Sequence, residues 1–403
     1  MRILFFTDYF RPEPPPPAHH IAERAALWRD AGHDVTIVTN HPNYPEGRIY
    51  PGYRNRLRTT ELTPEGTRVV RVWTHIAAHH HRLRKLLDHA SYGVNATFQA
   101  LREPSPDVVV ATTPHLFVGV AGALFARLRK CPLLLEVRDL WPDSVLPAGS
   151  TSYRLFKQLE RFIYRSADVV SVMTPKFEPH VRAEGARRVV TVVGGVDRSR
   201  FGPGPKPRHL LEAGELADRF VVGYPGTLGT AHDIELIVEV GRRLAGTNVV
   251  FLFIGGGPHM ERLRALAGGQ VGRFRFIGTQ PPDRMGDWWR TMDAGLVLLR
   301  NTDAMRTVIP SKIFEAMASG KPTVHVGPRG AASELIESHC AGVVLDGDAA
   351  SVADGLRALA EDRARCEALG GNALRASACY GRDRHAADTL EVIQSMLSGS
   401  SRP

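Results

Sequence analysis

Residues 2–40 read RILFFTDYFRPEPPPPAHHIAERAALWRDAGHDVTIVTN and contain the features that decide the fold. The first and last segments, RILFFT and DVTIVTN, are apolar runs of the kind found in strands buried on both faces. Between them, apolar residues at helical spacing predict a helix over residues 20–31, and Gly32 ends it. Strand, helix and strand in one short stretch form a βαβ unit, which predicts a parallel sheet.

The alternation of strands and helices continues along the chain. Further strands are predicted at the apolar runs VVRVWT (69–74), DVVVAT (107–112), PLLLEVRD (132–139), DVVSVMT (168–174), VVTVVGG (189–195), FVVGYPG (220–226), NVVFLFI (248–254), RFRFIG (273–278), AGLVLL (294–299), KPTVHVG (321–327) and AGVVLD (341–346). The stretch GPGPKPRH, residues 202–209, has a composition typical of linkers. Because 403 residues are too many for one hydrophobic core, two α/β domains are predicted. Ligands of such sheets bind at the carboxyl ends of the strands, and a cleft between the domains is the expected site.

Composition excludes several classes of protein. Hydrophobic residues make up 43% and charged residues 23%, which is an ordinary globular composition, and no stretch reaches the ~18 apolar residues of a membrane-spanning helix. The four cysteines form no C-x-x-C pair, which argues against a zinc or disulfide framework. The N-terminus lacks the long apolar region and the cleavage site of a secretory signal, so a cytoplasmic protein is expected.

The chain is basic, with a net charge of +9, and its densest basic cluster is HHHRLRK at residues 79–85. Leu86, Leu87 and Tyr92 follow this cluster, and a basic segment with apolar residues between its charges suits an anionic membrane surface. A solvated helix face explains the same pattern equally well. Because no zinc-finger, homeodomain or RNA-binding signature accompanies the charge, nucleic acid is not an expected partner.

The strongest functional motif is IPSKIFEAMASGKP, residues 309–322. Pro310 suits the start of a helix, which places Ser311 and Lys312 in its first turn, where N–H groups point at an anion. A lysine there opposes the helix dipole, so a phosphate ligand explains it better than helix stability does. Glu315 lies one turn later on the same face, where it is placed to hydrogen-bond a ribose; a surface Lys–Glu pair is the alternative.

Three further motifs lie at the ends of predicted strands. GYPGTLGT (223–230) and FIGGGP (253–258) place glycines where the backbone can approach a phosphate, although a tight turn explains each of them as well. LEVRDLWPDS (135–144) ends a strand at Arg138 and Asp139, which are either site residues or partners in a salt bridge.

Taken together, these segments resemble glycosyltransferase family 4, of GT-B fold, and most closely the subgroup that includes N-acetylfucosamine transferases of O-antigen and capsule biosynthesis. HPNYPEGRIYPGY (41–53) and PSKIFEAMASGKP carry the resemblance, and RILFFTDYFRPE, AGHDVTIVT, LEVRDLWPDS and GAASELI support it over nearly the whole chain. It implies an α/β protein of two Rossmann-like βαβ domains that face each other across an interdomain cleft. Residues 1–200 are then the acceptor-side domain and residues 201–380 the nucleotide-sugar-binding domain, and a C-terminal helix, about 381–403, packs back on the first domain.

The resemblance also implies an activity and a set of site residues. The expected enzyme is a retaining transferase that moves a hexosyl or N-acetylhexosaminyl group from a nucleotide-sugar, most often UDP-linked, to a glycan, lipid-linked or small-molecule acceptor. Its catalytic residues are implied to be Lys312, Arg138 and Asp139, and its donor-binding residues Gly226, Gly229, Gly256, Ile277, Gly278, Ser311, Lys312 and Glu315. No cofactor and no metal ion are expected, because no D-x-D-like pair lies where the chemistry of the family places one.

This chain departs from the family pattern at three places. Thr307 stands where the first glutamate of the family's pair is found, Thr230 stands where many members have a basic residue, and Pro15–Pro16 replace the glycine pair of the first loop. Proline has no N–H group, so that loop is expected not to donate hydrogen bonds to a phosphate there. Arg300 or Arg306 is the candidate for the missing positive charge.

Several functions fit the pattern. Surface-polysaccharide or lipid-linked glycan assembly is favoured, in the cytoplasm and at the inner face of the cytoplasmic membrane if residues 79–85 bind lipid. A natural-product glycosyltransferase, a nucleotide-sugar epimerase of the same fold and a non-catalytic sugar-nucleotide-binding partner are the alternatives. The motif at residues 41–53 argues against the epimerase, and the departures at Thr307, Thr230 and Pro15–Pro16 motivate the non-catalytic partner.

Overall fold

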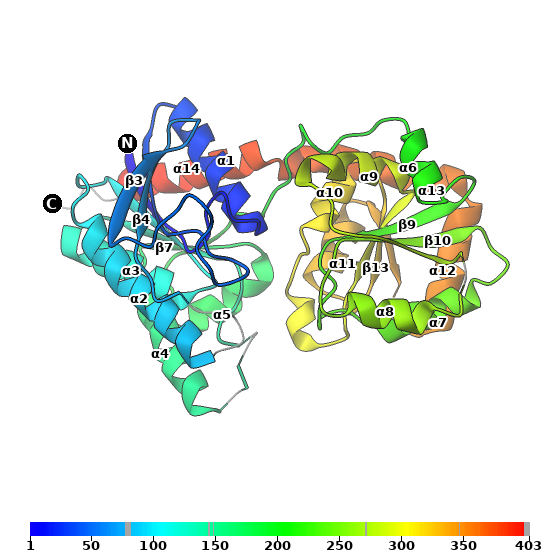
Figure 1. The fold of residues 1–403 in the computed structure, drawn as a ribbon, viewed down its shortest axis with the longest axis horizontal. Helices are drawn as coiled ribbons and strands as arrows, with labels where there is room; N and C mark the ends of the chain where they lie inside the picture. Colours follow the sequence, from blue (N-terminus) through cyan, green and yellow to red (C-terminus); the bar gives the residue numbers. More distant parts are fainter. Residues whose placement is uncertain (77–81, 144–145, 148, 271, 346, 399–403) are drawn as a thin grey trace. The chain divides into compact units, whose positions relative to one another are not determined.

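The computed structural model describes residues 1–76, 82–143, 146–147, 149–270, 272–345 and 347–398, and the chain divides into two compact units. The first unit comprises Met1–Val193 together with Arg382–Pro403, and the second comprises Gly194–Gly381. Figure 1 shows the ribbon coloured along the chain. Each unit has a central sheet with helices packed on it in the Rossmann-like manner, so the predicted class of two α/β domains is confirmed.

In the described residues, the sheet of the first unit has eight strands in the order β3-β4-β2-β1-β5-β6-β7-β8. The strands are β1 Arg2–Phe6, β2 Asp34–Asn40, β3 Arg58–Leu62, β4 Arg68–Val72, β5 Val108–Thr112, β6 Leu133–Val137, β7 Val169–Val172 and β8 Val189–Thr191. Neighbours are parallel except β3 and β4, which pair antiparallel at one edge. The sequence does not predict β3, because its residues RTTEL are polar and partly exposed and form no apolar run.

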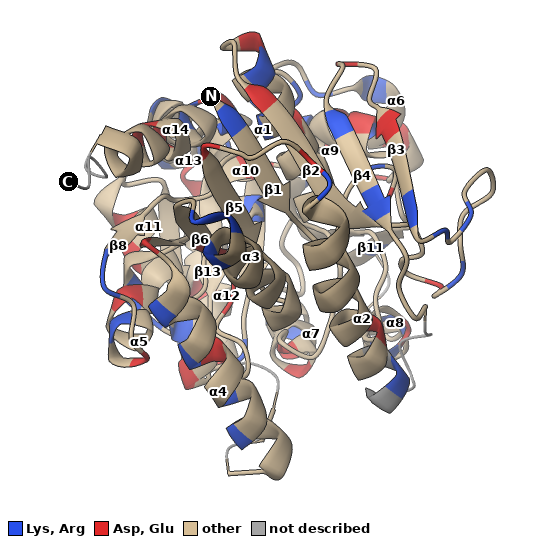
Figure 2. Ribbon diagram, turned by 90° about the vertical axis from the view of Figure 1, so that its left-hand side faces the viewer, with Lys and Arg blue, Asp and Glu red and all other residues tan. Residues whose placement is uncertain are grey.

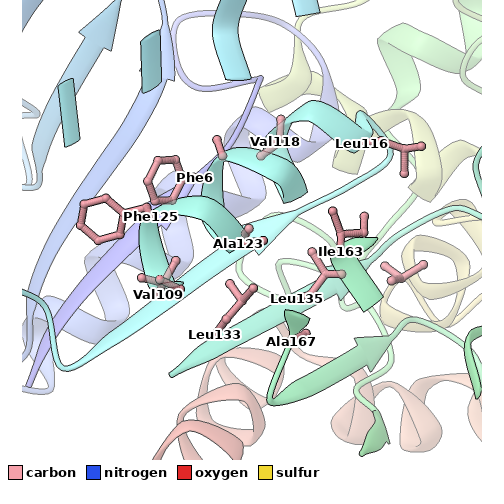
Figure 3. Close-up of a cluster of buried hydrophobic side chains, with 14 of the residues drawn as sticks. Phe6, Val109, Leu116, Val118, Ala123, Phe125, Leu133, Leu135, Ile163 and Ala167 are labelled. Carbon is pink, nitrogen blue, oxygen red and sulfur yellow. The ribbon is translucent and has the colours of Figure 1, made fainter. Parts of the chain in front are cut away.

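Helices cover both faces of this sheet. They are α1 Pro16–Asp30, α2 Arg82–Ala100, α3 Leu116–Arg129, α4 Thr151–Ser166, α5 Glu178–Ala183 and α14 Arg382–Ser398, with a 3-10 turn η1 at Pro175–Phe177. Side chains alternate along a strand, so Leu4 and Phe6 of β1 pack with α2, α3 and α4, whereas Ile3 and Phe5 pack with α1 and α14. Figure 3 shows part of the first cluster, in which the rings of Phe6 and Phe125 lie 5.6 Å apart.

The last helix, α14, belongs to the first unit and lies against α1. The indole N–H of Trp28 in α1 donates a 2.9 Å hydrogen bond to the carbonyl oxygen of Ala386 in α14, and Ile393 is buried in the same core cluster as Trp28. The chain therefore leaves the first unit after Val193 and returns to it at Arg382.

Helix α1 begins at Pro16, earlier than the predicted residue 20. Pro15 is the N-cap, and prolines occupy the first turn, where N–H groups have no partner within a helix. The last two prolines of the proline-rich stretch, Pro16 and Pro17, are therefore the start of a helix, and the residues before them form the loop. It presents no N–H group at Pro15 or Pro16, as expected from the chemistry of proline.

In the described residues, the sheet of the second unit has six strands, all parallel, in the order β11-β10-β9-β12-β13-β14. They are β9 Phe220–Pro225, β10 Val249–Ile254, β11 Phe274–Ile277, β12 Ala294–Leu298, β13 Thr323–Val326 and β14 Gly342–Leu345. Each strand lies within one of the predicted runs. Parallel strands present all their carboxyl ends at one edge, so the loops that follow β9, β10, β11 and β12 lie together there.

The helices of the second unit are α6 Arg208–Ala213, α7 Ile234–Arg243, α8 Met260–Ala267, α9 Met285–Thr291, α10 Lys312–Ala318, α11 Ala331–Ser338, α12 Ala349–Glu361 and α13 Arg363–Ala376, with 3-10 turns η2 Pro282–Arg284, η3 Asp303–Arg306 and η4 Ser377–Tyr380. Phe251 of β10 is buried against Ile237 of α7 and Leu263 of α8 in one core cluster. The helix α10 lies within the motif IPSKIFEAMASGKP, begins at Lys312 and ends at Ala318.

Candidate active site

In the second unit, the loops after β9 and β10 are joined at the carboxyl edge of the sheet. The N–H of Gly226 donates to the carbonyl oxygen of Ile254 over 2.8 Å, and the N–H of Leu228 donates to that of Gly256 over 2.8 Å. A Cβ atom on Gly257 would lie 2.4 Å from the carbonyl oxygen of Leu228, and the φ of +124° is one that glycine adopts readily. The two glycine motifs therefore form two loops that are hydrogen-bonded to each other and that pack too closely for a larger residue at position 257.

Other predicted donor-binding residues belong to the same edge. A Cβ atom on Gly229 or Gly278 would meet no atom within 4 Å, so these positions face open space. Ile277 ends β11, and its carbonyl oxygen accepts a 3.0 Å hydrogen bond from the N–H of Gly255. The loops after β9, β10 and β11 therefore adjoin one another where ligands of such sheets bind.

Lys312, the first residue of α10, reaches toward these loops. Its ammonium nitrogen lies 3.2 Å from the centre of the Tyr224 ring, and a Cβ atom on Gly226 would lie 3.8 Å from that nitrogen. Burial lowers the pKa of Lys312 from 10.5 to about 7, and the Glu315 carboxylate opposes this change. The lysine has lost part of its charge near neutral pH, and an anionic ligand would restore that charge.

Tyr224 is held by His232, a residue that the sequence reasoning missed. The Tyr224 hydroxyl lies 2.6 Å from His232 Nε2, and His232 Nδ1 lies 2.9 Å from the backbone nitrogen and from the carbonyl oxygen of Gly229. Burial lowers the pKa of His232, and the charge of Lys312 adds to this effect. His232 comes two residues after Thr230, the position at which many members of the family have a basic residue. A basic side chain so near the glycine turn was the signal by which the sequence could have identified His232.

Glu315 lies one turn after Lys312, as its spacing predicts. Its Oε2 accepts a 3.0 Å hydrogen bond from the indole N–H of Trp289, and the Trp289 side chain is buried. The carboxylate is therefore oriented by a buried partner, which a mobile surface Lys–Glu pair would not require.

The amino end of α10 contributes less than the motif suggests. The helix has seven residues, and Ser311 is an N-cap whose exposed side chain makes no capping hydrogen bond. So short a helix has few aligned peptide dipoles. An anion bound at this edge would therefore be recognised by the side chain of Lys312 more than by the end of the helix.

The structure distinguishes between Arg300 and Arg306, the two candidates for the positive charge that the family has and this chain lacks at Thr230. Nε of Arg300 donates to the carbonyl oxygen of His232 over 3.2 Å, so Arg300 lies beside the Tyr224–His232 pair. Arg306 instead pairs with Asp303 over 3.2 Å in the turn η3, which Thr307 follows. Arg300 is therefore the better placed of the two.

In the first unit, a buried ion pair lies at the end of β6. Arg24 of α1 and Glu136 of β6 contact each other through two N–H···O bonds of 2.5 and 2.8 Å, and both side chains are buried. The sequence indicates Arg138 and Asp139 at this strand end but not the pair beside them. Glu136 is one polar residue within an apolar run, and its partner lies 112 positions earlier in the chain.

Arg138 lies next to this ion pair, and Asp139 follows it; both side chains are partly buried. Burial lowers the pKa of Arg138 from 12.5 to about 10; Glu136 opposes this change and Arg24 adds to it. The Nε of Arg138 is buried and has no hydrogen-bond partner among the described residues. The carboxyl end of β6 therefore offers an incompletely satisfied cation, which suits a polar ligand.

Glu13, in the loop after β1, anchors the motif at residues 41–53. Its Oε1 accepts hydrogen bonds from the N–H groups of Asn43 and Tyr44, at 2.9 and 3.0 Å. Burial raises the pKa of Glu13 from 4.5 to about 7, and the two hydrogen bonds oppose this change. The loop after β1 and the motif at residues 41–53 are therefore held together by the Glu13 carboxylate.

Two family models match the chain. The model described as Glycosyl transferase 4-like domain matches residues 17–195, and the model described as Glycosyl transferases group 1 matches residues 219–362. The first match falls in the unit that holds Arg138 and Glu136, and the second in the unit that holds Lys312 and Glu315.

Relatives of similar length match most of the chain. The chain is 24% identical over 344 residues to WcaI of Escherichia coli, named as a colanic acid biosynthesis glycosyl transferase, and the match covers 79% of this chain and 82% of WcaI. It is 27% identical over 328 residues to D-inositol 3-phosphate glycosyltransferase 1 of Catenulispora acidiphila, covering 74% of this chain and 75% of the relative.

Solved structures share the fold. Sucrose-phosphate synthase from Thermosynechococcus elongatus superposes with a TM-score of 0.78 at 16% identity, over 99% of this chain and 100% of that one. HepE of Anabaena, solved in complex with UDP-glucose, superposes with a TM-score of 0.73 at 17% identity, over 98% of this chain and 100% of that one.

Proposed function

This chain is a glycosyltransferase of the GT-B type, and we propose that it transfers a sugar from a UDP-sugar to a glycan acceptor with retention of configuration. HepE, which has the same fold, was solved with UDP-glucose, and this supports the uridine nucleotide. The relative named for colanic acid biosynthesis supports a role in surface-polysaccharide or lipid-linked glycan assembly. The motif at residues 41–53 supports the subgroup of N-acetylfucosamine transferases.

The position of Lys312 carries this proposal. As the bond between the sugar and the diphosphate breaks, negative charge grows on the leaving oxygen, and a preorganised cation stabilises that charge. Lys312 lies against Tyr224 beside Gly226, on the loops where the diphosphate is proposed to bind. The acceptor oxygen bonds to the anomeric carbon, and the leaving diphosphate takes the proton of the acceptor. No metal ion has a part in this scheme, so turnover is expected to persist in excess chelator.

A thermal-shift screen of the purified protein against UDP, GDP, dTDP and their sugars tests the proposal. A ligand that binds the folded state alone raises the melting temperature, by an amount set by its affinity. We expect UDP and one UDP-sugar to raise it. A shift with GDP alone would overturn the uridine assignment, and tight donor binding without turnover on any acceptor would favour a non-catalytic partner. Conversion of the donor without any acceptor would favour an epimerase.

Binding of UDP near pH 8 is expected to take up protons. The pKa of Lys312 is about 7 before binding, so the lysine is mostly neutral at pH 8, and a bound diphosphate raises that pKa by stabilising the ammonium form. Titration calorimetry in buffers of different ionisation enthalpy measures the uptake, which should approach one proton at most. Lys312→Met should abolish it, and a wild-type enthalpy independent of the buffer would exclude a neutral lysine.

Glu315→Ala is expected to weaken UDP binding by about tenfold or more, since hydrogen bonds to a charged group contribute roughly 1.5–3 kcal/mol. Calorimetric affinities compare this variant with Glu337→Ala, which removes an exposed carboxylate from α11 in the same unit. If both variants bind UDP like the wild type, Glu315 has no contact with the nucleotide.

We also propose that α2 and α3 present a membrane-binding face. The exposed apolar side chains of these helices include Leu87, Val94, Phe98, Leu124 and Leu128. Several of them line a groove of about 620 Å³ between the helices, and Arg127 also lines it. Figure 2 shows α2 and α3 with charged residues gathered near their ends and none along their middle turns.

Charge favours lipid over a second copy of the chain on this face. Arg84 and Arg127 are exposed on α2 and α3, and in a symmetric dimer such cations would face cations, whereas anionic lipid attracts them. Of the basic segment 79–85, residues 79–81 lie outside the described residues. Among the described residues, no helix is long and apolar enough to cross a membrane.

The double variant Phe98→Ser with Leu128→Ser is expected to bind vesicles containing phosphatidylglycerol about thirtyfold more weakly than the wild type, because each apolar side chain contributes roughly 1 kcal/mol when partly inserted. The two side chains are 62% and 61% exposed. The control is Leu62→Ser, which removes a 70% exposed leucine from β3. Vesicle co-sedimentation is the measurement, and equal binding of all three proteins would exclude this face.

A further inference from the structure

A pocket of about 510 Å³ lies in the first unit, away from the residues proposed for sugar transfer. The last turns of α3 and α4 line it, together with Pro132, which precedes β6, and Asp168, which precedes β7. The pocket therefore lies at the amino ends of these strands, whereas Arg138 and Asp139 lie beyond the carboxyl end of β6.

Three exposed cations line this pocket without a partner from the protein. Among the described residues, no ion pair or hydrogen bond holds the charged groups of Arg127, Lys130 and Arg165. The neighbouring Arg129 differs, because its guanidinium donates to the carbonyl oxygen of Leu101. Like charges that share one concavity repel one another, so an anion in the pocket would be attracted by all three.

The ends of α3 and α4 do not require these three side chains. Basic residues in the last turn of a helix often hydrogen-bond its free carbonyl groups. Here the backbone supplies those bonds, since the N–H groups of Lys130 and Cys131 donate to the carbonyl oxygen of Ala126, and that of Ala167 donates to Ile163. The charged groups therefore remain free to bind a ligand.

The acidic groups of the pocket do not balance its cations. Asp168 is the single carboxylate among its described lining residues, and its Oδ2 accepts a 2.8 Å hydrogen bond from the N–H of Leu133. Burial raises the pKa of Cys131 to about 11, so this thiol is neutral near pH 7. The pocket therefore keeps an excess of positive charge, which favours an anionic ligand.

Other ionisable groups of the first unit have partners of opposite charge or hydrogen-bonding type. The Lys157 ammonium lies 3.0 Å from Asp143. At the carboxyl edge of the sheet, Asp8 Oδ2 lies 3.3 Å from His115 Nε2, and the His115 ring is stacked on that of His89. In each of these groups a carboxylate meets a basic side chain, whereas three cations share one carboxylate in the pocket.

The apolar groove between α2 and α3 meets this pocket at Arg127, which lines both. Figure 2 shows α3 between α2 and α4, and α3 packs against each of them. Val120 and Leu124 of α3 line the groove, and Lys130, further along the chain, lines the pocket. An apolar groove that ends at a cationic pocket matches a molecule with a hydrocarbon chain and one anionic end.

The lining of the groove favours a hydrocarbon chain over an extended peptide. Its polar residues are Thr97 and Arg127, and the Thr97 hydroxyl donates a 2.8 Å hydrogen bond to the carbonyl oxygen of Gly93. An extended peptide in the groove would leave many of its N–H and C=O groups without partners, which is unfavourable. A hydrocarbon chain has no such groups.

We propose that the pocket lined by Arg127, Lys130 and Arg165 binds the phosphate of one anionic phospholipid, and that a hydrocarbon chain of this lipid occupies the groove between α2 and α3. Guanidinium groups suit a phosphate because they bind two of its oxygens at once. The inference rests on the proposed membrane-binding face and adds to it a saturable site for a single lipid. It is independent of the proposed sugar transfer.

Calorimetric titration with dihexanoyl phosphatidylglycerol, kept below its critical micelle concentration, tests the site without a membrane. We expect one lipid to bind per chain, and its Kd to rise about tenfold or more in Lys130→Gln with Arg165→Gln, because charge-assisted hydrogen bonds are lost. The control is Arg154→Gln, which removes an exposed arginine from the first turn of α4 and should bind like the wild type.

Two further ligands separate the parts of the site. Inorganic phosphate should bind about tenfold more weakly or less, because it has no chain to place in the groove. Dihexanoyl phosphatidylcholine should also bind more weakly, because its choline group compensates the charge of its phosphate. The melting temperatures of all variants should equal that of the wild type, since the substituted side chains are exposed.

Equal affinity of the wild type and the double variant for the monomeric lipid, or no binding, would overturn the proposal. Inorganic phosphate that binds as tightly as the lipid would overturn it too, because the pocket would then be a site for a free anion. Vesicle binding without binding of the monomeric lipid would reject the site and keep the membrane-binding face. Binding of the monomeric lipid without vesicle binding would support the site and reject the face.

Discussion

Lys312→Met is expected to lower kcat/KM by ~10²-fold or more, the loss seen when a group that stabilises transition-state charge is removed. The ammonium nitrogen lies 3.2 Å from the Tyr224 ring centre and next to Gly226, so it is placed on the loops proposed to hold the diphosphate. Methionine fills the same space without charge. The loss should fall on kcat more than on KM, because the leaving oxygen is most charged in the transition state.

Steady-state kinetics with saturating acceptor measure this effect. Arg242→Met is the matched control, since it removes an exposed cation from α7 of the same unit and should leave the rate unchanged. Lys312→Arg shows whether charge alone suffices, because the planar guanidinium cannot occupy the same position over the ring. A Lys312→Met enzyme within twofold of the wild type would remove the residue from the mechanism.

Glu136→Ala is expected to destabilise the first unit by about 3–5 kcal/mol, the usual cost of leaving one member of a buried ion pair without its partner. Arg24, which lies 5.0 Å from the Phe5 ring centre and 4.9 Å from that of Trp28, would remain charged in an apolar setting. Because whole domains are stable by only ~5–15 kcal/mol, a variant that melts far below the wild type is expected.

Urea denaturation and thermal melting measure this loss. Replacing both partners, as Arg24→Met with Glu136→Leu, should recover most of the stability, because a packed apolar pair needs no counter-charge. The control is Asp388→Ala, which breaks a 2.7 Å pair with the exposed Arg384 in α14 of the same unit and should cost at most about 1 kcal/mol. A similar cost for Glu136→Ala would show that the pair is solvated.

The stability that the Arg24–Glu136 pair provides depends on pH. Burial raises the pKa of Glu136, but Arg24 outweighs this effect and holds the pKa below its ordinary value of 4.5. The stabilisation is therefore complete above the unfolded-state pKa and is lost as the pH falls through the folded-state pKa.

The layout of the two domains could be read from the sequence because buried parallel strands leave long apolar runs. Each strand of the second unit lies within a predicted run, whereas the polar edge strand β3, residues 58–62, has no such run and was missed. The start of α1 was misplaced because proline signals a loop and also suits the first turn of a helix.

The residues of the candidate site likewise fall into those that the sequence could predict and those that it could not. Motifs that are continuous in the chain, such as Lys312 with Glu315 or the glycine turns, could be found from spacing, since local geometry follows from local sequence. Residues whose meaning depends on a distant partner could not. Asp8 acquires its setting from His115, and Glu136 from Arg24, over more than a hundred positions.

The sequence by itself determined two α/β domains of a glycosyltransferase and the segment that offers a lysine to an anion, because helix and strand periods and short motifs are local properties. Tertiary structure alone decided that Lys312 lies on the face of Tyr224, where burial lowers its pKa, that Arg24 pairs with Glu136, and that two imidazoles stack beside Asp8. Charge state and hydrogen-bonding capacity depend on burial and on neighbours, and these exist once distant segments have packed together.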